Sequence, residues 1–336
     1  MTSVVVVEDS LVQRAHLVHI LQAEGDIHVV GQAVGATEAI RLVKALRPDV
    51  VTLDLQIPDG GGQHAIEQIM AFSPTPILVL SATVTSRGSQ EAVAALLAGA
   101  LDALPKPTTW DAAAERAIRD RVRALQKVTV IRHSRGGRAP EHLRTNAPRQ
   151  SGLGRAVVAI GASAGGPPAL ADVLSGLAGL RASVLVVQHL HADFVGGLVT
   201  WMAGASALPV ELAQHGAPLR PGVVYIAPGG THLMLGAGHQ IELNTSPPSL
   251  HRPSVDVLFS SVAQRAEGPK AGVLLTGMGA DGAAGLLEIR QRRGLTIAQD
   301  KATSAVFGMP QAAQRLDAAT HILALGEIAA AVTRWI

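Results

Sequence analysis

The sequence predicts two α/β domains joined by a basic linker. The chain has 336 residues, which exceeds the usual length of one domain. Short apolar segments alternate with helical patterns on both sides of a basic central stretch that lacks this alternation. Alternation of this kind is typical of a parallel sheet covered by helices on both faces. We therefore expect a first domain over residues 1–125, a linker over residues 126–152 and a second domain over residues 153–336.

The first domain is expected to contain five strands with helices between them. The predicted strands are short apolar runs at residues 4–7, 29–33, 50–53, 77–80 and 100–104. Five such units in about 125 residues predict a flavodoxin-like domain with a parallel sheet in the order 2-1-3-4-5. In this topology the functional groups gather beyond the carboxyl ends of the strands.

The second domain is also predicted to be a doubly wound α/β domain. Its expected strands lie at residues 156–160, 184–187, 223–227, 272–275, 295–298 and 322–323. Helical patterns lie between most of them, at residues 168–177, 255–265 and 283–293. No repeat of 20 to 50 residues relates the two halves, so they share only the class of fold.

Composition excludes several classes of protein. Hydrophobic residues make up 48% of the chain and charged residues 16%, but no run of about 18 apolar residues occurs. We therefore expect a globular protein that is not embedded in a membrane. The N-terminus lacks the features of a signal peptide, which favours a cytoplasmic location. The absence of cysteine excludes disulfides, thiolate metal sites and a cysteine nucleophile.

The linker carries a local excess of positive charge. Between Arg116 and Arg155 the chain has eleven arginines and lysines but only two acidic residues, Asp120 and Glu141. A solvated tether explains this composition, and nucleic-acid binding is the alternative. Since the stretch has no aromatic residues that could stack on bases, we expect no nucleic-acid partner.

Acidic residues follow two strands that are neighbours in the predicted sheet. Glu8 and Asp9 come after the first strand and Asp54 after the third. Crowded carboxylates need a cation, and hard oxygen ligands with open positions favour Mg²⁺. Ser81 ends the fourth strand and Lys106 follows the fifth, so both can contact a phosphoryl group on Asp54. Any one of these residues alone could be a helix cap or a turn residue, but their joint placement indicates a site.

This set of residues resembles the receiver domain of two-component response regulators, over roughly residues 2–125. The resemblance implies that Asp54 is the phosphoacceptor, that Glu8, Asp9 and Asp54 hold Mg²⁺, and that Ser81 and Lys106 contact the phosphate. Receivers more often have two aspartates where this chain has Glu8 and Asp9. They usually have an aromatic residue at the position of Ala103, so coupling here is expected to run through the loop after Ser81.

A serine follows the first expected strand of the second domain. It lies in the turn Gly161-Ala-Ser163-Ala-Gly-Gly166, before two prolines and a helical pattern. Such a serine is exposed, and amides at the helix N-terminus can stabilise an oxyanion. The alternative is a turn that binds a dinucleotide, which expects an acidic residue at the end of the next strand. That strand ends at His189 instead, and a histidine suits a general base beside a serine.

An aspartate completes this group of residues. Asp281 lies in Leu-Thr-Gly-Met-Gly-Ala-Asp-Gly, after the strand expected at residues 272–275. A buried carboxylate there can orient the imidazole of His189 and stabilise its charged form. A helix-capping role is the alternative for Asp281. Asp193 is the competing partner for His189, but we expect it to cap a helix beginning at Phe194. The order Ser, His, Asp differs from that of α/β-hydrolases and indicates another scaffold.

Several motifs of the second domain resemble the chemotaxis protein-glutamate methylesterases, over about residues 155–333. They are Gly-Ala-Ser-Ala-Gly-Gly, Gln-His-Leu-His-Ala-Asp-Phe, Tyr-Ile-Ala-Pro-Gly, Arg-Pro-Ser-Val-Asp-Val-Leu-Phe, Leu-Thr-Gly-Met-Gly-Ala-Asp-Gly, Gln-Asp-Lys-Ala-Thr-Ser and Phe-Gly-Met-Pro. The resemblance implies that Ser163 is the nucleophile, His189 the base and Asp281 its orienting carboxylate, with the backbone N–H of Met278 as an oxyanion donor. The family more often has threonine where this chain has Ala164, which implies that a hydroxyl contact to the histidine or substrate is absent here.

The resemblance implies hydrolysis of glutamyl methyl esters on chemotaxis receptors, with release of methanol, and deamidation of selected receptor glutamines. A chemotaxis histidine kinase is the expected phosphodonor. Phosphorylation of Asp54 is expected to relieve an inhibitory docking of the receiver over the esterase site. Mg²⁺ is the expected cofactor of the receiver, and none is expected for the esterase reaction.

Two other functions stay open at the level of sequence. The second domain could be a catalytically silent module that binds kinase or receptor, although the serine, histidine and aspartate argue against this. A transcription factor would need a recognition helix, for which the basic linker is the only candidate. His232 and His251 are expected at surface or loop positions, without a further role.

Overall fold

The computed structural model describes residues 1–81, 86–128 and 155–336, with the side chains of residues 86–89 left out. The chain divides into two compact units, one formed by Met1–Val130 with Leu190–Trp201 and the other by Ile131–His189 with Met202–Ile336. The predicted linker, residues 126–152, lies outside the described residues apart from its first three positions. The predicted start of the second domain, residue 153, lies outside them too.

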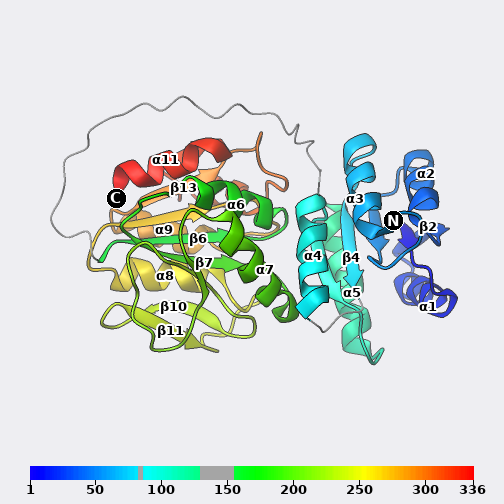
Figure 1. Ribbon diagram of the computed structural model, residues 1–336, viewed down its shortest axis with the longest axis horizontal. Helices are drawn as coiled ribbons and strands as arrows, with labels where there is room; N and C mark the ends of the chain where they lie inside the picture. Colours follow the sequence, from blue (N-terminus) through cyan, green and yellow to red (C-terminus); the bar gives the residue numbers. More distant parts are fainter. Residues whose placement is uncertain (82–85, 129–154) are drawn as a thin grey trace. The chain divides into compact units, whose positions relative to one another are not determined.

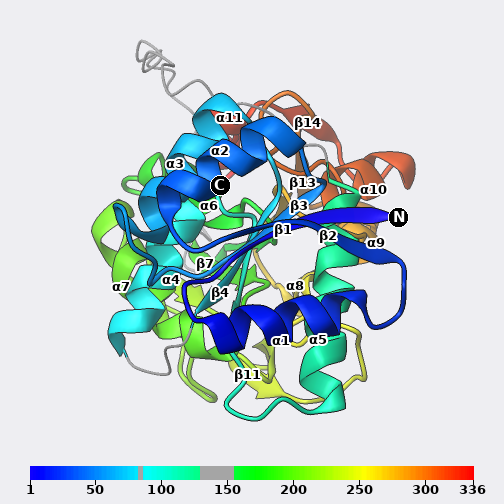
Figure 2. The ribbon, with the colours of Figure 1, turned by 90° about the vertical axis from the view of Figure 1, so that its right-hand side faces the viewer.

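The first unit contains a five-stranded parallel sheet in the order β2-β1-β3-β4-β5, which confirms the predicted flavodoxin-like topology. Its strands are β1 (Thr2–Val7), β2 (Ile27–Ala33), β3 (Val50–Leu53), β4 (Ile77–Ser81) and β5 (Asp102–Pro105). Its helices are α1 (Leu11–Gln22), α2 (Ala36–Leu46), α3 (Gly61–Phe72), α4 (Ser86–Ala98) and α5 (Ala112–Gln126). Helices α1 and α5 pack together on one side of the sheet, and α2 and α3 on the other (Figure 2).

Apolar strands flanked by capped helices explain this arrangement. Residues 4–7 of β1 are all at most 1% exposed, because helices cover both faces of the sheet. The Ser10 hydroxyl accepts a hydrogen bond from the Gln13 N–H and so caps α1. The Asp111 side chain accepts from the N–H groups of Ala113 and Ala114 and caps α5.

The second unit is built on a seven-stranded parallel sheet in the order β14-β13-β12-β6-β7-β9-β8. Its strands are β6 (Val157–Ala162), β7 (Ser183–Gln188), β8 (Val210–Leu212), β9 (Val224–Ile226), β12 (Lys270–Leu274), β13 (Leu295–Gln299) and β14 (His321–Leu323). A separate antiparallel hairpin consists of β10 (His232–Gly236) and β11 (Gln240–Asn244). The helices along residues 155–336 are α6 (Gly166–Ser175), α7 (Ala192–Ala205), α8 (Val255–Arg265), α9 (Ala283–Gln291), α10 (Met309–Arg315) and α11 (Leu325–Trp335); the part of α7 up to Trp201 is grouped with the first unit.

Helix α8 joins the hairpin to the main sheet. It packs against both β10 and α9, while α6 packs against α11 (Figure 1). Apolar side chains of α8, such as Leu258 and Phe259, are fully buried in one core with Leu233 and Leu235 of β10. The hairpin and the N-terminus of α8 are therefore fixed by a shared core.

Sequence patterns predicted most of these elements but missed the hairpin, β8, α10 and α11. The hairpin was missed because its strands are short: β10 has an apolar run of three residues after His232, and β11 alternates over only two apolar residues, so neither pattern stands out. The last strand of the first unit begins at Asp102 rather than at residue 100. Ala100 and Leu101 are buried but precede the hydrogen-bonded ladder. Their apolar side chains extended the apolar run from which the strand was predicted.

The register of the second sheet places three strand ends side by side. Gly161 of β6 pairs with Val187 of β7 on one side and with Leu274 of β12 on the other. All three strands are parallel, so the loops that follow them emerge at the same edge. Among the described helices, none combines the length and apolar character needed to cross a membrane.

Candidate functional site

Ser163 follows β6 in a turn that is tied to the loop after β12. Its backbone N–H donates to the Thr276 carbonyl over 3.0 Å, and the Thr276 hydroxyl donates to the Ala164 carbonyl over 2.9 Å. Gly165 adopts a φ of +71° as the N-cap of α6, a conformation that favours glycine. The expectation of an exposed serine is wrong: Ser163 is 7% exposed, because the turn holds it at the edge of the sheet with little room around it.

The loop after β12 approaches the serine closely. A Cβ atom on Gly277 would lie 2.7 Å from the Cβ of Ser163, so only glycine fits there. The Gly277 carbonyl accepts from the N–H groups of Gly308 and Met309, which fixes the loop from behind. Met278 follows Gly277 directly in the chain, so its backbone lies close to the serine turn, and its role as an oxyanion donor stays a prediction.

His189 follows β7 and points its Nε2 atom at Asp281. The backbone N–H of His189 donates to the Ala162 carbonyl over 2.9 Å, next to Ser163 in the chain. The distance from His189 Nε2 to Asp281 Oδ2 is 2.8 Å, and the two side chains are 9% and 8% exposed. With the proton on Nε2 donated to the carboxylate, Nδ1 is the nitrogen left to accept a proton. The structure thus brings His189 and Asp281 together and places Ser163 on the adjacent strand end.

Asp281 is held by the N-terminus of α8. Its carboxylate accepts from the Ser254 hydroxyl at 2.8 Å, the Val255 N–H at 2.7 Å and the Asp256 N–H at 2.9 Å. Burial alone would raise the pKa of Asp281, but the hydrogen bonds from His189 and from the two backbone N–H groups hold that pKa well below its usual range. Asp281 therefore remains a carboxylate beside the imidazole.

Asp193 does not compete for His189. The prediction that it caps a helix beginning at Phe194 is wrong, because α7 begins at Ala192 and Asp193 lies within its first turn. The Asp193 carboxylate lies 3.4 Å from Nδ1 of His191, on the same short segment. A negatively charged side chain in the first turn of a helix interacts favourably with the helix dipole, which explains the aspartate there.

Two residues that sequence reasoning missed contact this group. Gln188 is 5% exposed, and its Nε2 donates to the carbonyls of Ser163 at 2.8 Å and His189 at 3.0 Å. It thus ties the backbone of the serine to that of the histidine. The ring of His251 stacks on His189, with 4.3 Å between ring centroids. The Gln-His pair at the end of an apolar strand was the available signal for Gln188; no sequence signal indicated His251.

The expectation that His232 lies at a surface or loop position is wrong. It is the first residue of β10 and is 0% exposed. The strand that begins at His232 was not predicted, and a histidine alone gives no indication that it is buried. His251 does lie in a loop, as expected, but its ring is in contact with His189.

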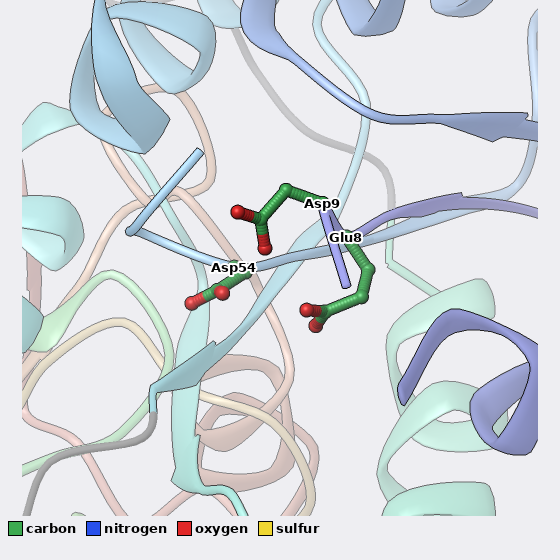
Figure 3. A group of neighbouring side chains, drawn as sticks. All are labelled: Glu8, Asp9 and Asp54. Carbon is green, nitrogen blue, oxygen red and sulfur yellow. The ribbon is translucent and has the colours of Figure 1, made fainter. Parts of the chain in front are cut away.

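The first unit gathers three carboxylates at the ends of β1 and β3. Glu8 and Asp9 follow β1, Asp54 follows β3, and one oxygen from each lies within 4.8 Å of the others (Figure 3). Lys106 follows β5, and its Nζ lies 2.7 Å from Glu8 Oε2 and 2.7 Å from Asp54 Oδ2. Ser81 is 2% exposed at the end of β4, and its carbonyl accepts from the Lys106 N–H at 2.7 Å.

This cluster suits a small divalent cation. Burial raises the pKa of Glu8 above its ordinary value even though Lys106 is adjacent, and the nearby charge of Asp54 adds to this. Asp9 is exposed and can turn its oxygens toward a bound ion. An all-oxygen donor set with one solvent-facing side is what Mg²⁺ prefers, since the ion retains water ligands. Position 103 in β5 is fully buried, and its side chain is the methyl group of Ala103 and not an aromatic ring.

Comparisons with known proteins match both units. Residues 158–332 match the family model described as CheB methylesterase, and residues 4–117 match the response regulator receiver domain. The chain is 47% identical over 328 residues to a protein-glutamate methylesterase/protein-glutamine glutaminase of Anaeromyxobacter dehalogenans, covering 97% of this chain and 94% of the relative. It is 45% identical over 294 residues to one of Bordetella avium, covering 87% and 85%. The crystal structure of the Thermotoga maritima CheB methylesterase catalytic domain covers 54% of this chain and 98% of its own, with 34% identity and a TM-score of 0.51.

Proposed function

Since this chain belongs to the CheB methylesterase family, we propose that it hydrolyses glutamate methyl esters of chemotaxis receptors under the control of its receiver domain. Its relatives are named protein-glutamate methylesterase/protein-glutamine glutaminase, so the proposed reactions are release of methanol and deamidation of receptor glutamines. The observation that carries the proposal is the 2.8 Å contact between His189 Nε2 and Asp281 Oδ2 beside the strand end that bears Ser163.

In the proposed acylation step Ser163 is the nucleophile. Nδ1 of His189 accepts the hydroxyl proton while Oγ attacks the ester carbonyl, and Asp281 stabilises the resulting imidazolium. The backbone N–H of Met278 donates to the oxyanion of the tetrahedral intermediate. The carbon–oxygen bond to the methoxy group then breaks, and the imidazolium returns its proton to the leaving methoxide. The products of this step are methanol and an acyl-enzyme.

Deacylation repeats the same chemistry with water. His189 takes a proton from water, hydroxide adds to the acyl carbon, and Ser163 leaves with the proton from the imidazolium. The receptor side chain is released as glutamate. A glutamine substrate follows the same steps with ammonia in place of methanol, because an amide carbonyl forms the same tetrahedral intermediate.

We propose that control begins at Asp54, with a chemotaxis histidine kinase as phosphodonor. Glu8, Asp9 and Asp54 are the residues that would hold Mg²⁺, which when bound supplies positive charge for the phosphoryl oxygens. Lys106, already within 2.7 Å of Asp54, neutralises further charge on those oxygens, and the hydroxyl of Ser81 is proposed to contact them. A phosphoryl group adds a charge of about −1.5 to −2, which is sufficient to bias a two-state element.

The hydrolase proposal is tested with receptor membranes that carry radiolabelled methyl esters. The full-length protein should release labelled methanol, and Ser163→Ala should reduce kcat by up to about 10⁶-fold. Ser175→Ala is the matched control, since that serine ends α6 and, among the described residues, its hydroxyl donates to the Asp172 carbonyl alone. If Ser163→Ala released methanol at the rate of the control, Ser163 would not be the nucleophile.

A further inference from the structure

His232 uses both ring nitrogens inside the protein. Nδ1 accepts from the Ser254 backbone N–H over 3.1 Å, and Nε2 lies 3.0 Å from the Pro247 carbonyl. A backbone N–H only donates and a carbonyl only accepts, so the ring is neutral with its proton on Nε2. Burial lowers the pKa of His232, which favours the same neutral form. The tautomer is therefore set by two backbone partners.

These two partners lie in one loop. Residues 245–254 connect the hairpin to α8, and His232 bonds to Pro247 near the start of this loop and to Ser254 at its end. The loop carries His251, whose ring stacks on His189. A buried ring that is bonded to the loop on both sides of His251 restricts the position of the stacked imidazole.

Ser254 links His232 to the carboxylate partner of His189. It is the N-cap of α8, and its hydroxyl and the N–H groups of the next two residues all donate to Asp281. The Nδ1 bond of His232 fixes the backbone of Ser254 at this N-cap. A shift of that backbone would move three hydrogen-bond donors of Asp281 together.

We propose that His232 is a positioning residue for the esterase, which holds the stacked His251 and the Asp281 carboxylate in place on two sides of His189. The proposal rests on the proposed function of Ser163, His189 and Asp281. His232 itself is separated from His189 by Ser254 and Asp281, so its effect passes through those residues. If His232 had only a structural role, its replacement would lower stability without a separate effect on kcat.

Variants that each keep one of the two hydrogen bonds of His232 can separate a positioning role from a structural role. In His232→Asn the amide oxygen takes the place of Nδ1 and can accept from Ser254, but the side chain is too short for Pro247. In His232→Gln the amide nitrogen takes the place of Nε2 and can donate to Pro247. His232→Phe keeps the size and removes both bonds. His215→Asn is the control, because Nδ1 of His215 also accepts a backbone N–H, from Leu243, but has no link to Asp281.

The experiment measures kcat and KM for methanol release from methylated receptor membranes, with thermal unfolding of each full-length variant. We expect His232→Phe to lower kcat by about 10-fold or more with KM changed less than about twofold, because the loss concerns placement of reacting groups. His232→Asn should recover most of kcat, His232→Gln less, and His215→Asn should match the wild type. Ser163→Ala is measured in parallel.

Two results would overturn the proposal. One is a wild-type kcat in folded His232→Phe. Another is a loss of kcat that follows the loss of thermal stability in every variant, with His232→Asn no better than His232→Gln. If His232→Phe does not fold, the order of the Asn and Gln variants decides. Activity in Ser163→Ala would instead refute the serine mechanism, so the two failures are distinguishable.

Discussion

The imidazole of His251 lies over that of His189, with ring planes 21° apart and centroids 4.3 Å apart. The second ring limits the directions in which the imidazole of His189 can turn, while the hydrogen bond to Asp281 limits its rotation in the plane. Proton transfer from Ser163 requires His189 in one orientation. The stacked ring therefore contributes to placement of the base without taking part in proton transfer.

His251→Ala should lower kcat, and His251→Phe should restore most of it, since phenylalanine keeps a flat ring against His189. Stacked aromatic pairs are worth about 0.5 to 1.5 kcal/mol, which corresponds to a loss of about 2-fold to 12-fold for the alanine variant. The check is kcat for methanol release in both variants beside wild type. Equal activity of His251→Ala and wild type would show that stacking does not matter for the base.

Two neighbouring carboxylates should affect stability with opposite dependence on pH. Burial, assisted by the nearby charge of Asp281, raises the pKa of Asp256. Hydrogen bonds lower the pKa of Asp281 despite its burial. The stability that Asp256 contributes is fully present below the unfolded pKa of about 4 and is lost as pH rises. The stability that Asp281 contributes is present above that pH and is lost as pH falls.

Asp256→Asn should therefore stabilise the protein at about pH 7 and change little at about pH 4, because asparagine still accepts from the Gly285 N–H but carries no charge. Asp281→Asn should destabilise the protein by a similar amount from about pH 7 down to about pH 4, with a difference from wild type that shrinks as the pH falls below that value. Urea unfolding of the three proteins at about pH 7, pH 4 and pH 3 is the measurement. A larger gain for Asp256→Asn in acid than at neutral pH would contradict the assigned shifts.

The basic linker should be dispensable for ester hydrolysis, because every proposed catalytic residue lies between Ser163 and Asp281. A fragment of residues 151–336 should release methanol without any phosphodonor. Its unfolding transition, followed by circular dichroism, shows whether it is folded. A well-folded fragment that is inert would mean that the division into domains over residues 1–125, 126–152 and 153–336 is wrong.

The sequence predicted positions at strand ends and missed the support around them. Ser163, His189 and Asp54 each stand directly after a buried strand, where the parallel topology implies convergence. Gln188 was missed because a polar residue at the last position of a strand gives no indication of which carbonyls it contacts. Ser254 and His251 depend on a loop whose course follows from the hairpin of β10 and β11, and the apolar patterns of these two five-residue strands are too short to stand out.

The most direct measurement is methanol release with and without acetyl phosphate and Mg²⁺, in wild type and in Asp54→Ala. The carboxylates of Glu8, Asp9 and Asp54 lie together, with Lys106 2.7 Å from Asp54, so a phosphoryl group on Asp54 has a prepared set of partners. With Ala103 in place of a ring that could swing, coupling is predicted to run through the loop after Ser81, whose residues 82–85 lie outside the described residues, and we expect activation to be smaller than in receivers that have an aromatic residue there. The account predicts that acetyl phosphate raises the rate of wild type, while Asp54→Ala keeps its basal rate and does not respond. Equal activation of both proteins would contradict it.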